Sequence, residues 1–277
     1  MTIVVTVQVT DGLVLAADSA TSFFDKDGQL AKIYNNANKI FNLVKVWPIG
    51  SMTYGAGSIG SASIGTLSKD LREKLSPTSD DPDFRLDQAA YTVEEVAHKA
   101  KEFLFNQSFK REYPDGVPGY FMGYRLCGYS AGAAFPEVWE IRILENACVG
   151  PVRIYEPDTF GIRWAGETEA LDRLILGVGS RFPEAMEQLG VAKEAADASY
   201  SEIISKLYVP LYLPAMPIQD AIDLARFLAN TAAQFTHFSL RGATVGGPIE
   251  VATITKHEGF KWVMRKHYYS QEFNQRG

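Results

Sequence analysis

The sequence predicts an α+β protein built as a four-layer αββα sandwich, in which two antiparallel sheets pack together and helices flank both outer faces. Three observations lead to this fold. Predicted strands and helices come in alternating blocks instead of single βαβ units, which is typical of layered α+β folds. The first strand pair is apolar on both faces, so both of its faces need a covering layer. The helix that begins near Pro217 carries an apolar stripe that must pack on a sheet.

The first half of the chain begins with a β-hairpin. Residues 2–9 and 12–18 are rich in β-branched and apolar residues, and Asp11-Gly12 between them is a tight-turn signal. A polar excursion over 23–38 follows. The elements expected next are strands at 39–44 and 51–56, a helix from the glycine-rich stretch 55–63 to about Leu75, a charged loop at 76–85 and a helix at 87–110.

The second half repeats the same block order. Four strands are expected at 120–129, 137–144, 152–155 and 161–165. Two or three helices then occupy about 168–206, and a further helix starts at Pro217, a residue favoured at a first helical position. Strands at 248–255 and 260–263 close the chain. We expect one domain over 1–277, with segments 76–120 and 190–216 longer than such a fold requires.

Composition excludes several classes of function. The chain has 277 residues, a net charge of −6, and only two cysteines, Cys127 and Cys148. It has no strongly basic character for nucleic acid, no apolar run long enough for a membrane, and no pattern of a signal peptide. The four histidines lie far apart and no CxxC occurs, so we expect no metal and no cofactor. A reducing, cytoplasmic location fits the cysteine count.

Two charged residues stand where apolar ones are expected. Asp18 ends a strand whose two faces are both apolar, so its buried carboxylate needs a partner. Lys39 starts a strand on the same face as Phe41 and Leu43, and its ammonium needs an anion. Taken singly, each is better explained as a solvated side chain or a turn cap. Their coincidence with a third residue favours an ion pair.

That third residue is Thr2, which follows Met1 and leads directly into a strand. Removal of Met1 would leave a threonine that carries both an α-amine and a hydroxyl. The reference pKa of an α-amine is about 7.7–8.0, so the amine can take the hydroxyl proton near neutral pH. A lysine ammonium nearby would favour the alkoxide, and Asp18 would keep Lys39 charged and oriented.

The glycine-rich segment that begins with Gly55-Ala56-Gly57 supplies backbone N–H groups just before a helix. Such groups can hold an oxyanion. The alternative is that these glycines only permit a turn from strand to helix.

The segments TIVVTVQVTDGLVLAADSATS, NANKIFNL and MTYGAGSIG resemble the start of proteasome β-type subunits, a family of N-terminal nucleophile (Ntn) hydrolases that includes bacterial HslV and the ancestral β-subunit, Anbu. The C-terminal GGPIEVATITKHEGFKWV resembles the closing strand pair of that family. The resemblance implies catalytic roles for Thr2 as nucleophile, Asp18 as acidic partner, Lys39 as catalytic lysine and Gly57 as oxyanion glycine. It implies that Ser22 binds substrate backbone. It also implies that the first specificity pocket has three wall residues: Ala37, Gly55 and Ile59.

Three positions depart from the family pattern. Glu167 stands where the family has a supporting serine, and Gly242 and Val245 stand where it has an aspartate and a serine. The glutamate and the VGGPIE pattern are closer to the ancestral β-subunit group.

The resemblance implies a threonine-type endopeptidase that acts in the cytoplasm on peptides or unfolded proteins inside a homo-oligomeric ring or spiral, with an ATPase partner left open. An amidase or transpeptidase with the same acyl-enzyme chemistry is one alternative, and a catalytically inactive ring subunit is another. We expect at least six copies. Apolar residues of the two predicted helices were expected to exceed one core face and to meet another copy; these are Leu67, Leu71, Leu75, Phe103 and Phe105.

Overall fold

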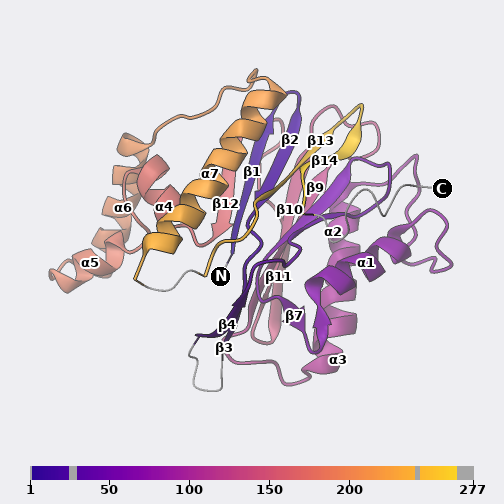
Figure 1. The fold of residues 1–277 in the computed structure, drawn as a ribbon, viewed down its shortest axis with the longest axis horizontal. Helices are drawn as coiled ribbons and strands as arrows, with labels where there is room; N and C mark the ends of the chain where they lie inside the picture. Colours follow the sequence, from indigo (N-terminus) through magenta and orange to yellow (C-terminus); the bar gives the residue numbers. More distant parts are fainter. Residues whose placement is uncertain (1, 25–29, 241–243, 267–277) are drawn as a thin grey trace.

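The computed structural model describes residues 2–24, 30–240 and 244–266. Two five-stranded antiparallel sheets form its centre (Figure 1). The first sheet has the order β12-β1-β2-β13-β14 and the second β11-β10-β9-β6-β5. The strands of the first sheet are β1 (Ile3–Val9), β2 (Gly12–Ala17), β12 (Gly161–Gly166), β13 (Glu250–Thr255) and β14 (Gly259–Met264). Those of the second are β5 (Ile40–Asn42), β6 (Ile49–Gly55), β9 (Phe121–Gly128), β10 (Glu137–Leu144) and β11 (Ala147–Arg153).

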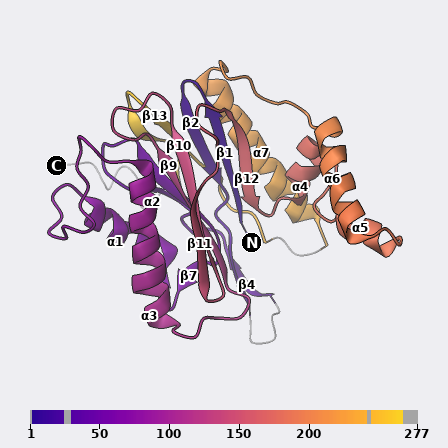
Figure 2. The same ribbon diagram turned by 180° about the vertical axis from the view of Figure 1, so that it is seen from behind.

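Helices cover the outer face of each sheet, as Figures 1 and 2 show from opposite sides. The first sheet is covered by α7 (Ile218–Phe238), α4 (Glu169–Leu171) and the π-helical η2 (Asp172–Leu176). The second is covered by α1 (Ile64–Leu75), α2 (Val93–Lys101), the π-helical η1 (Glu102–Phe109) and α3 (Lys110–Glu112). Helices α5 (Phe182–Gln188) and α6 (Lys193–Leu207) pack on each other, and α6 also packs on η2. The predicted αββα sandwich is confirmed.

Strand β1 illustrates why the sequence adopts this fold. It lies between β12 and β2, and all seven of its residues are buried. Its odd-numbered residues face α7, in a core that includes Val5 and Val7. Its even-numbered residues face the second sheet, where Thr6 and Gln8 are buried with polar partners: the Thr6 hydroxyl bonds the Tyr155 hydroxyl at 3.0 Å, and Gln8 Nε2 donates to the Thr159 carbonyl at 2.8 Å.

Two short hairpins lie beside the sheets. One is β3 (Thr21–Phe24) with β4 (Leu30–Tyr34), and the other is β7 (Ser58–Ile59) with β8 (Ala62–Ser63). The first hairpin begins at Thr21 and overlaps the polar excursion expected at 23–38, of which residues 25–29 lie outside the described residues.

The helix predicted over 87–110 begins later than expected, at Val93. The Thr92 hydroxyl caps it by accepting from Glu95 N at 3.0 Å, and Asp87 holds the preceding residues in turns through its bond from Ala89 N at 2.9 Å. From Glu102 the helix continues with wider, π-helical turns, so Phe103, Leu104, Phe105, Ser108 and Phe109 are all buried.

The expected surplus of apolar residues on these helices was wrong. Leu67, Leu71, Leu75, Phe103 and Phe105 are each at most 9% exposed within one chain. The segment between α1 and α2 supplies the missing cover, because three of its side chains pack into the same core: Phe84, Leu86 and Tyr91. Phe84 lies in the predicted charged loop at 76–85, and Tyr91 lies in the part of the predicted helix 87–110 that is not helical, so both regions help to shield these helices.

The strand expected at 152–155 also differs. Strand β11 covers Ala147–Arg153 and pairs with β10 directly after a turn at Glu145, whose φ is +52°. Half-exposed residues in β11 weaken the apolar signal that would have placed its start.

Candidate active site

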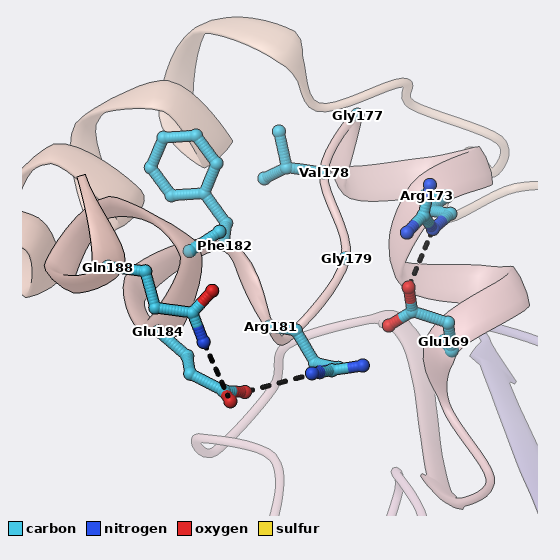
Figure 3. Close-up of a pocket in the computed structure, with 10 residues that line it drawn as sticks. Glu169, Arg173, Gly177, Val178, Gly179, Arg181, Phe182, Glu184 and Gln188 are labelled. Carbon is cyan, nitrogen blue, oxygen red and sulfur yellow. Dashed lines mark hydrogen bonds and ion pairs between the residues drawn. The ribbon is translucent and has the colours of Figure 1, made fainter.

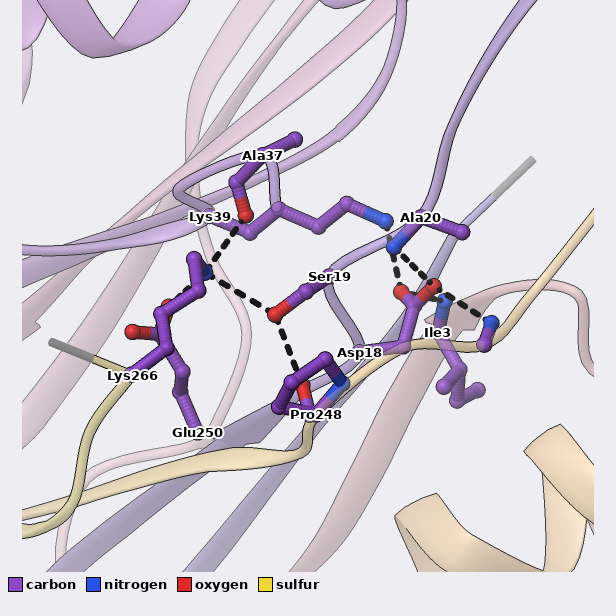
Figure 4. A network of polar contacts seen from close by, with 10 residues as sticks. Ile3, Asp18, Ser19, Ala20, Ala37, Lys39, Pro248, Glu250 and Lys266 are labelled. Atoms are coloured by element: carbon purple, nitrogen blue, oxygen red, sulfur yellow. Dashed lines mark hydrogen bonds and ion pairs between the residues drawn. The ribbon is translucent and has the colours of Figure 1, made fainter. Parts of the chain in front are cut away.

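The centre of the site is a buried ion pair. Lys39 Nζ lies 2.6 Å from Asp18 Oδ1, and the two side chains are 5% and 0% exposed (Figure 4). Asp18 directly follows β2, and Lys39 directly precedes β5, so the pair joins the ends of two strands from different sheets. The ion pair predicted from the sequence is confirmed.

Backbone donors complete the coordination of the Asp18 carboxylate. Oδ1 also accepts from Ile3 N at 3.0 Å, while Oδ2 accepts from Ala20 N at 3.1 Å and Gly246 N at 3.0 Å. Hydrogen bonds to the charged form stabilise a buried carboxylate. Asp18 therefore holds the start of β1, the chain after β2 and the approach to β13 at one point.

Burial lowers the pKa of Lys39 below its usual value, and Asp18 opposes that effect. The backbone fixes the segment that carries the lysine. Ala37 N donates to the Ser19 carbonyl at 2.9 Å, and Thr53 N donates to the Lys39 carbonyl at 2.9 Å. The backbone that carries Lys39 is thus fixed by two hydrogen bonds, and Asp18 holds its ammonium.

Thr2 lies beside this pair. The Asp18 carboxylate accepts from the N–H of Ile3, the residue that follows Thr2. Thr2 is 3% exposed, and its carbonyl accepts from Glu167 N at 2.7 Å. Gly166 makes that approach possible: its φ is +97°, and a Cβ there would lie 1.8 Å from the Thr2 carbonyl oxygen. Met1, whose removal the sequence interpretation requires, lies outside the described residues.

Gly57 and strand β3 face each other near this end of the sheets. Gly57 is exposed, and a Cβ on it would lie 3.0 Å from the Thr21 hydroxyl. The neighbouring Ser22 is partly buried, and its hydroxyl has no hydrogen-bond partner within the described part of the chain. A side chain at position 57 would crowd this approach. The role of Ser22 in binding substrate backbone stays a prediction.

The three residues assigned to the first specificity pocket have different surroundings. Ala37 is partly buried and lies beside Ser19. Gly55 is exposed at the end of β6, where the Phe121 carbonyl lies against it. Ile59 is 4% exposed and packs in the core between the second sheet and its helices. Their assignment as pocket walls stays a prediction.

The three positions that depart from the family pattern also differ in location. Glu167 contacts Thr2 through its backbone N–H, as described above. Val245 is 1% exposed and packs in the core beneath α7. Gly242 lies outside the described residues.

A second buried ion pair next to Asp18 was missed by the sequence analysis. Lys266 Nζ lies 2.7 Å from Glu250 Oε2, and these side chains are 7% and 1% exposed (Figure 4). The same ammonium donates to the Ser19 hydroxyl at 2.9 Å and to the Ala37 carbonyl at 2.7 Å. Glu250 offered a usable signal, because it is the single charged residue of its strand and begins it, just as Asp18 ends an apolar one. Lys266 offered none, because it stands alone after the last strand.

A second group of charged residues lies outside this site and is paired within itself. A hollow of about 430 Å³ lies between η2 and α5 (Figure 3). Its charged residues pair with one another: Arg173 Nε lies 2.6 Å from Glu169 Oε1, and Arg181 Nε lies 3.2 Å from Glu184 Oε2. Within the described ranges, no cluster of three or more His, Cys, Asp or Glu side chains is placed to hold a metal. No helix in the same ranges combines the length and apolar character that a bilayer crossing requires.

Comparison with known proteins identifies the fold. No protein-family model matches the sequence, and no curated protein matches it. Among solved structures, Anbu (ancestral beta-subunit) from Yersinia bercovieri matches with a TM-score of 0.54 and 14% identity, over 96% of this chain and 88% of that one. A Gly-1 mutant of Anbu from Hyphomicrobium sp. strain MC1 matches with a TM-score of 0.53 and 14% identity, over 96% and 86%. The chain thus shares the fold of the ancestral β-subunit, in agreement with the resemblance seen in the sequence.

Proposed function

We propose that this chain is a threonine-type peptidase of the N-terminal nucleophile class, with Thr2 as its nucleophile. The observation that carries the proposal is the buried Asp18–Lys39 pair, whose carboxylate bonds the backbone one residue after Thr2. Burying two charges is costly unless they are paired and hydrogen-bonded. The Asp18–Lys39 pair lies beside Thr2, which would carry both a hydroxyl and an α-amine after removal of Met1. Its role would be to favour the alkoxide of that hydroxyl.

The reaction runs in two halves. The Thr2 α-amine, exposed when Met1 is removed, takes the proton of the Thr2 hydroxyl as the oxygen attacks the substrate carbonyl. The Lys39 ammonium favours the developing alkoxide, and the N–H of Gly57 donates a hydrogen bond to the oxyanion. The amine proton passes to the leaving nitrogen as the peptide bond breaks. Water then attacks the resulting ester, regenerating the hydroxyl and releasing the acid.

Labelling by a mechanism-based probe tests this proposal. A peptide epoxyketone or β-lactone should modify the purified protein at Thr2, and intact-protein mass should show that Met1 is absent. Thr2→Ala should abolish both labelling and peptide hydrolysis, because no hydroxyl remains. The matched control is Thr10→Ala, which removes an exposed hydroxyl at the far end of β1 and should leave both readouts intact. Undiminished hydrolysis by Thr2→Ala would refute the mechanism.

We also propose that the chain associates with copies of itself through the outer face of α7. Three phenylalanines on this helix, Phe227, Phe235 and Phe238, are 51%, 45% and 79% exposed, and they line a groove of about 740 Å³. The opposite face of α7 is buried on the first sheet. A second copy is the occupant best supported, because the matching solved structure is by its name a subunit and self-association is the default for soluble proteins.

Light scattering over a range of concentrations tests self-association. An assembly of at least six copies is expected. A stable monomer near 30.6 kDa that still cleaves peptides would contradict an enclosed chamber and favour a free-standing amidase.

A further inference from the structure

The ion pair between Lys266 and Glu250 lies beside the proposed catalytic pair without being part of it. All three bonds of the Lys266 ammonium are directed to groups that bear on the site: the Ser19 hydroxyl at 2.9 Å, the Ala37 carbonyl at 2.7 Å and Glu250 Oε2 at 2.7 Å. An ammonium has three protons, so this one is fully used. Figure 4 shows Lys266 reaching these groups while Lys39 extends toward Asp18.

The two chain segments that Lys266 joins are the ones that position the catalytic pair. Ser19 follows Asp18, and Ala37 comes two residues before Lys39. They are already linked by the bond from Ala37 N to the Ser19 carbonyl at 2.9 Å. Lys266 adds a second link, from the Ala37 carbonyl through the ammonium to the Ser19 hydroxyl. The Ser19 hydroxyl in turn donates to the Pro248 carbonyl at 2.6 Å, which fixes both segments to the start of β13.

Lys266 also places a second positive charge near Lys39. Lys266 is among the groups that lower the pKa of Lys39, after the larger effect of burial, and Asp18 acts on both lysines in the opposite sense. The remaining charged groups that act on Lys266 are Glu250, which favours its ammonium, and Arg265, which disfavours it. Removing the Lys266 charge should therefore make Lys39 easier to protonate.

We propose that Lys266 is a positioning residue for the threonine site: its ammonium fixes the distance between the segments that carry Asp18 and Lys39. The inference rests on the proposed function for its consequence in catalysis. The effect of the Lys266 charge on the proton affinity of Lys39 is measured by titration without turnover, whereas the positioning effect is measured by kcat.

Two substitutions separate geometry from charge. Lys266→Met removes the charge and leaves the Ala37 carbonyl without its partner; kcat should fall about ten- to a hundredfold from misplacement of the reacting groups. The alkaline limb of the pH–rate profile, where Lys39 loses its proton, should move upward, because a positive charge near Lys39 is lost. Lys266→Arg keeps the charge in a larger head group, so kcat should fall while the alkaline limb stays near that of the wild type.

The matched control is Lys261→Met, which removes an exposed lysine from β14, the same strand that leads to Lys266. Both kcat and the pH profile should be unchanged. If Lys266→Met fails to fold because Glu250 is left unpaired, the double variant Lys266→Met/Glu250→Gln removes both charges. It should show the same loss of kcat and a smaller shift of the limb, because an anion is lost together with the cation.

The decisive measurement is the titration of Lys39 by NMR of ¹³Cε-labelled lysine in the catalytically silent Thr2→Ala protein, with the signal assigned by its loss in Lys39→Met. Lys266→Met should raise the Lys39 midpoint, because a nearby positive charge is lost, and Lys261→Met should leave it in place. Equal midpoints in the two variants would overturn the electrostatic part, and an unchanged kcat in Lys266→Met would overturn the positioning part. An enzyme that fails to label at Thr2 would contradict the proposed function while leaving the NMR result to decide on Lys266.

Discussion

Replacing Asp18 by Asn should destabilise the fold strongly. The Asp18 carboxylate is fully buried and accepts from Lys39 Nζ and from three backbone N–H groups. Asn has nearly the same shape, but its amide offers one oxygen, and its NH₂ group faces donors. The change also leaves the 4% exposed Lys39 ammonium without its counter-charge. Removing one partner of a buried ion pair costs about 3–5 kcal/mol, so we expect the free energy of unfolding to fall by about that amount.

The loss should depend on pH. Without Asp18, the folded-state pKa of Lys39, already lowered by burial, should fall further below the unfolded value of about 10.4. The folded protein then binds fewer protons than the unfolded chain, so the stability of Asp18→Asn should rise as the pH increases from 7 toward 10. Wild type should gain less over the same range. Adding Lys39→Met to Asp18→Asn should recover stability, because the unpaired charge is gone.

Urea denaturation at fixed protein concentration, at pH 7 and at pH 9.5, measures these effects. The Lys74–Asp81 pair is a matched control, since its 2.7 Å separation is close to that of the buried pair but its side chains are about one-third exposed. Asp81→Asn should leave the urea midpoint nearly unchanged. The reasoning is refuted if Asp18→Asn behaves like Asp81→Asn, or if Lys39→Met makes the Asp18→Asn protein still less stable.

Three further predictions concern other parts of the chain. Gly166→Ala should lower both the free energy of unfolding and the proposed peptidase activity, because the new Cβ would collide with the Thr2 carbonyl oxygen. Urea denaturation and probe labelling measure the two effects, and unaltered labelling would contradict the geometry. The Cys127 thiol is fully buried, and burial raises its pKa to about 12. It should therefore resist alkylation at pH 8, while the less buried Cys148 reacts first. Peptide mass spectrometry of the alkylated native protein would record the order. Phe238→Ser should shift the assembly toward smaller species in light scattering without lowering the thermal midpoint of the monomer, because this side chain is 79% exposed within one chain.

The sequence predicted the layered fold because most strands carry strong local signals. The hairpin of β1 and β2, with its apolar faces and Asp11-Gly12 turn, is an example in which pattern and structure agree closely. The start of α2 was misplaced because the cap at Thr92 competes with an equally helical composition upstream. The surplus of apolar residues on these helices was overestimated for two reasons: the charge of the loop at 76–85 concealed the part of Phe84 in the core, and Tyr91 was assigned to a helix instead of to the covering segment.

The candidate site could be predicted only in part, for a different reason. Asp18 could be identified because it is a charged residue at the end of an apolar strand, and Lys39 because it is a charged residue at the start of one. The contribution of Gly246 and Lys266 depends on how β13 and β14 pair beside β2, which is a property of the tertiary fold. No local sequence pattern predicts that the Lys266 side chain donates to the Ala37 carbonyl, which lies 229 residues earlier in the chain.

The wide sequence separation of the groups around Asp18 has a consequence for the order of synthesis. Ile3 and Ala20 leave the ribosome early, whereas Gly246 follows 228 residues after Asp18, and chains emerge from the N-terminus onward. Until that late segment arrives, β2 lacks its neighbour β13 and Asp18 lacks one of its donors. A nascent chain therefore holds the first strands of the site without its finished charge arrangement, so any hydrolytic capacity would be withheld until the segment around Gly246 has been synthesised.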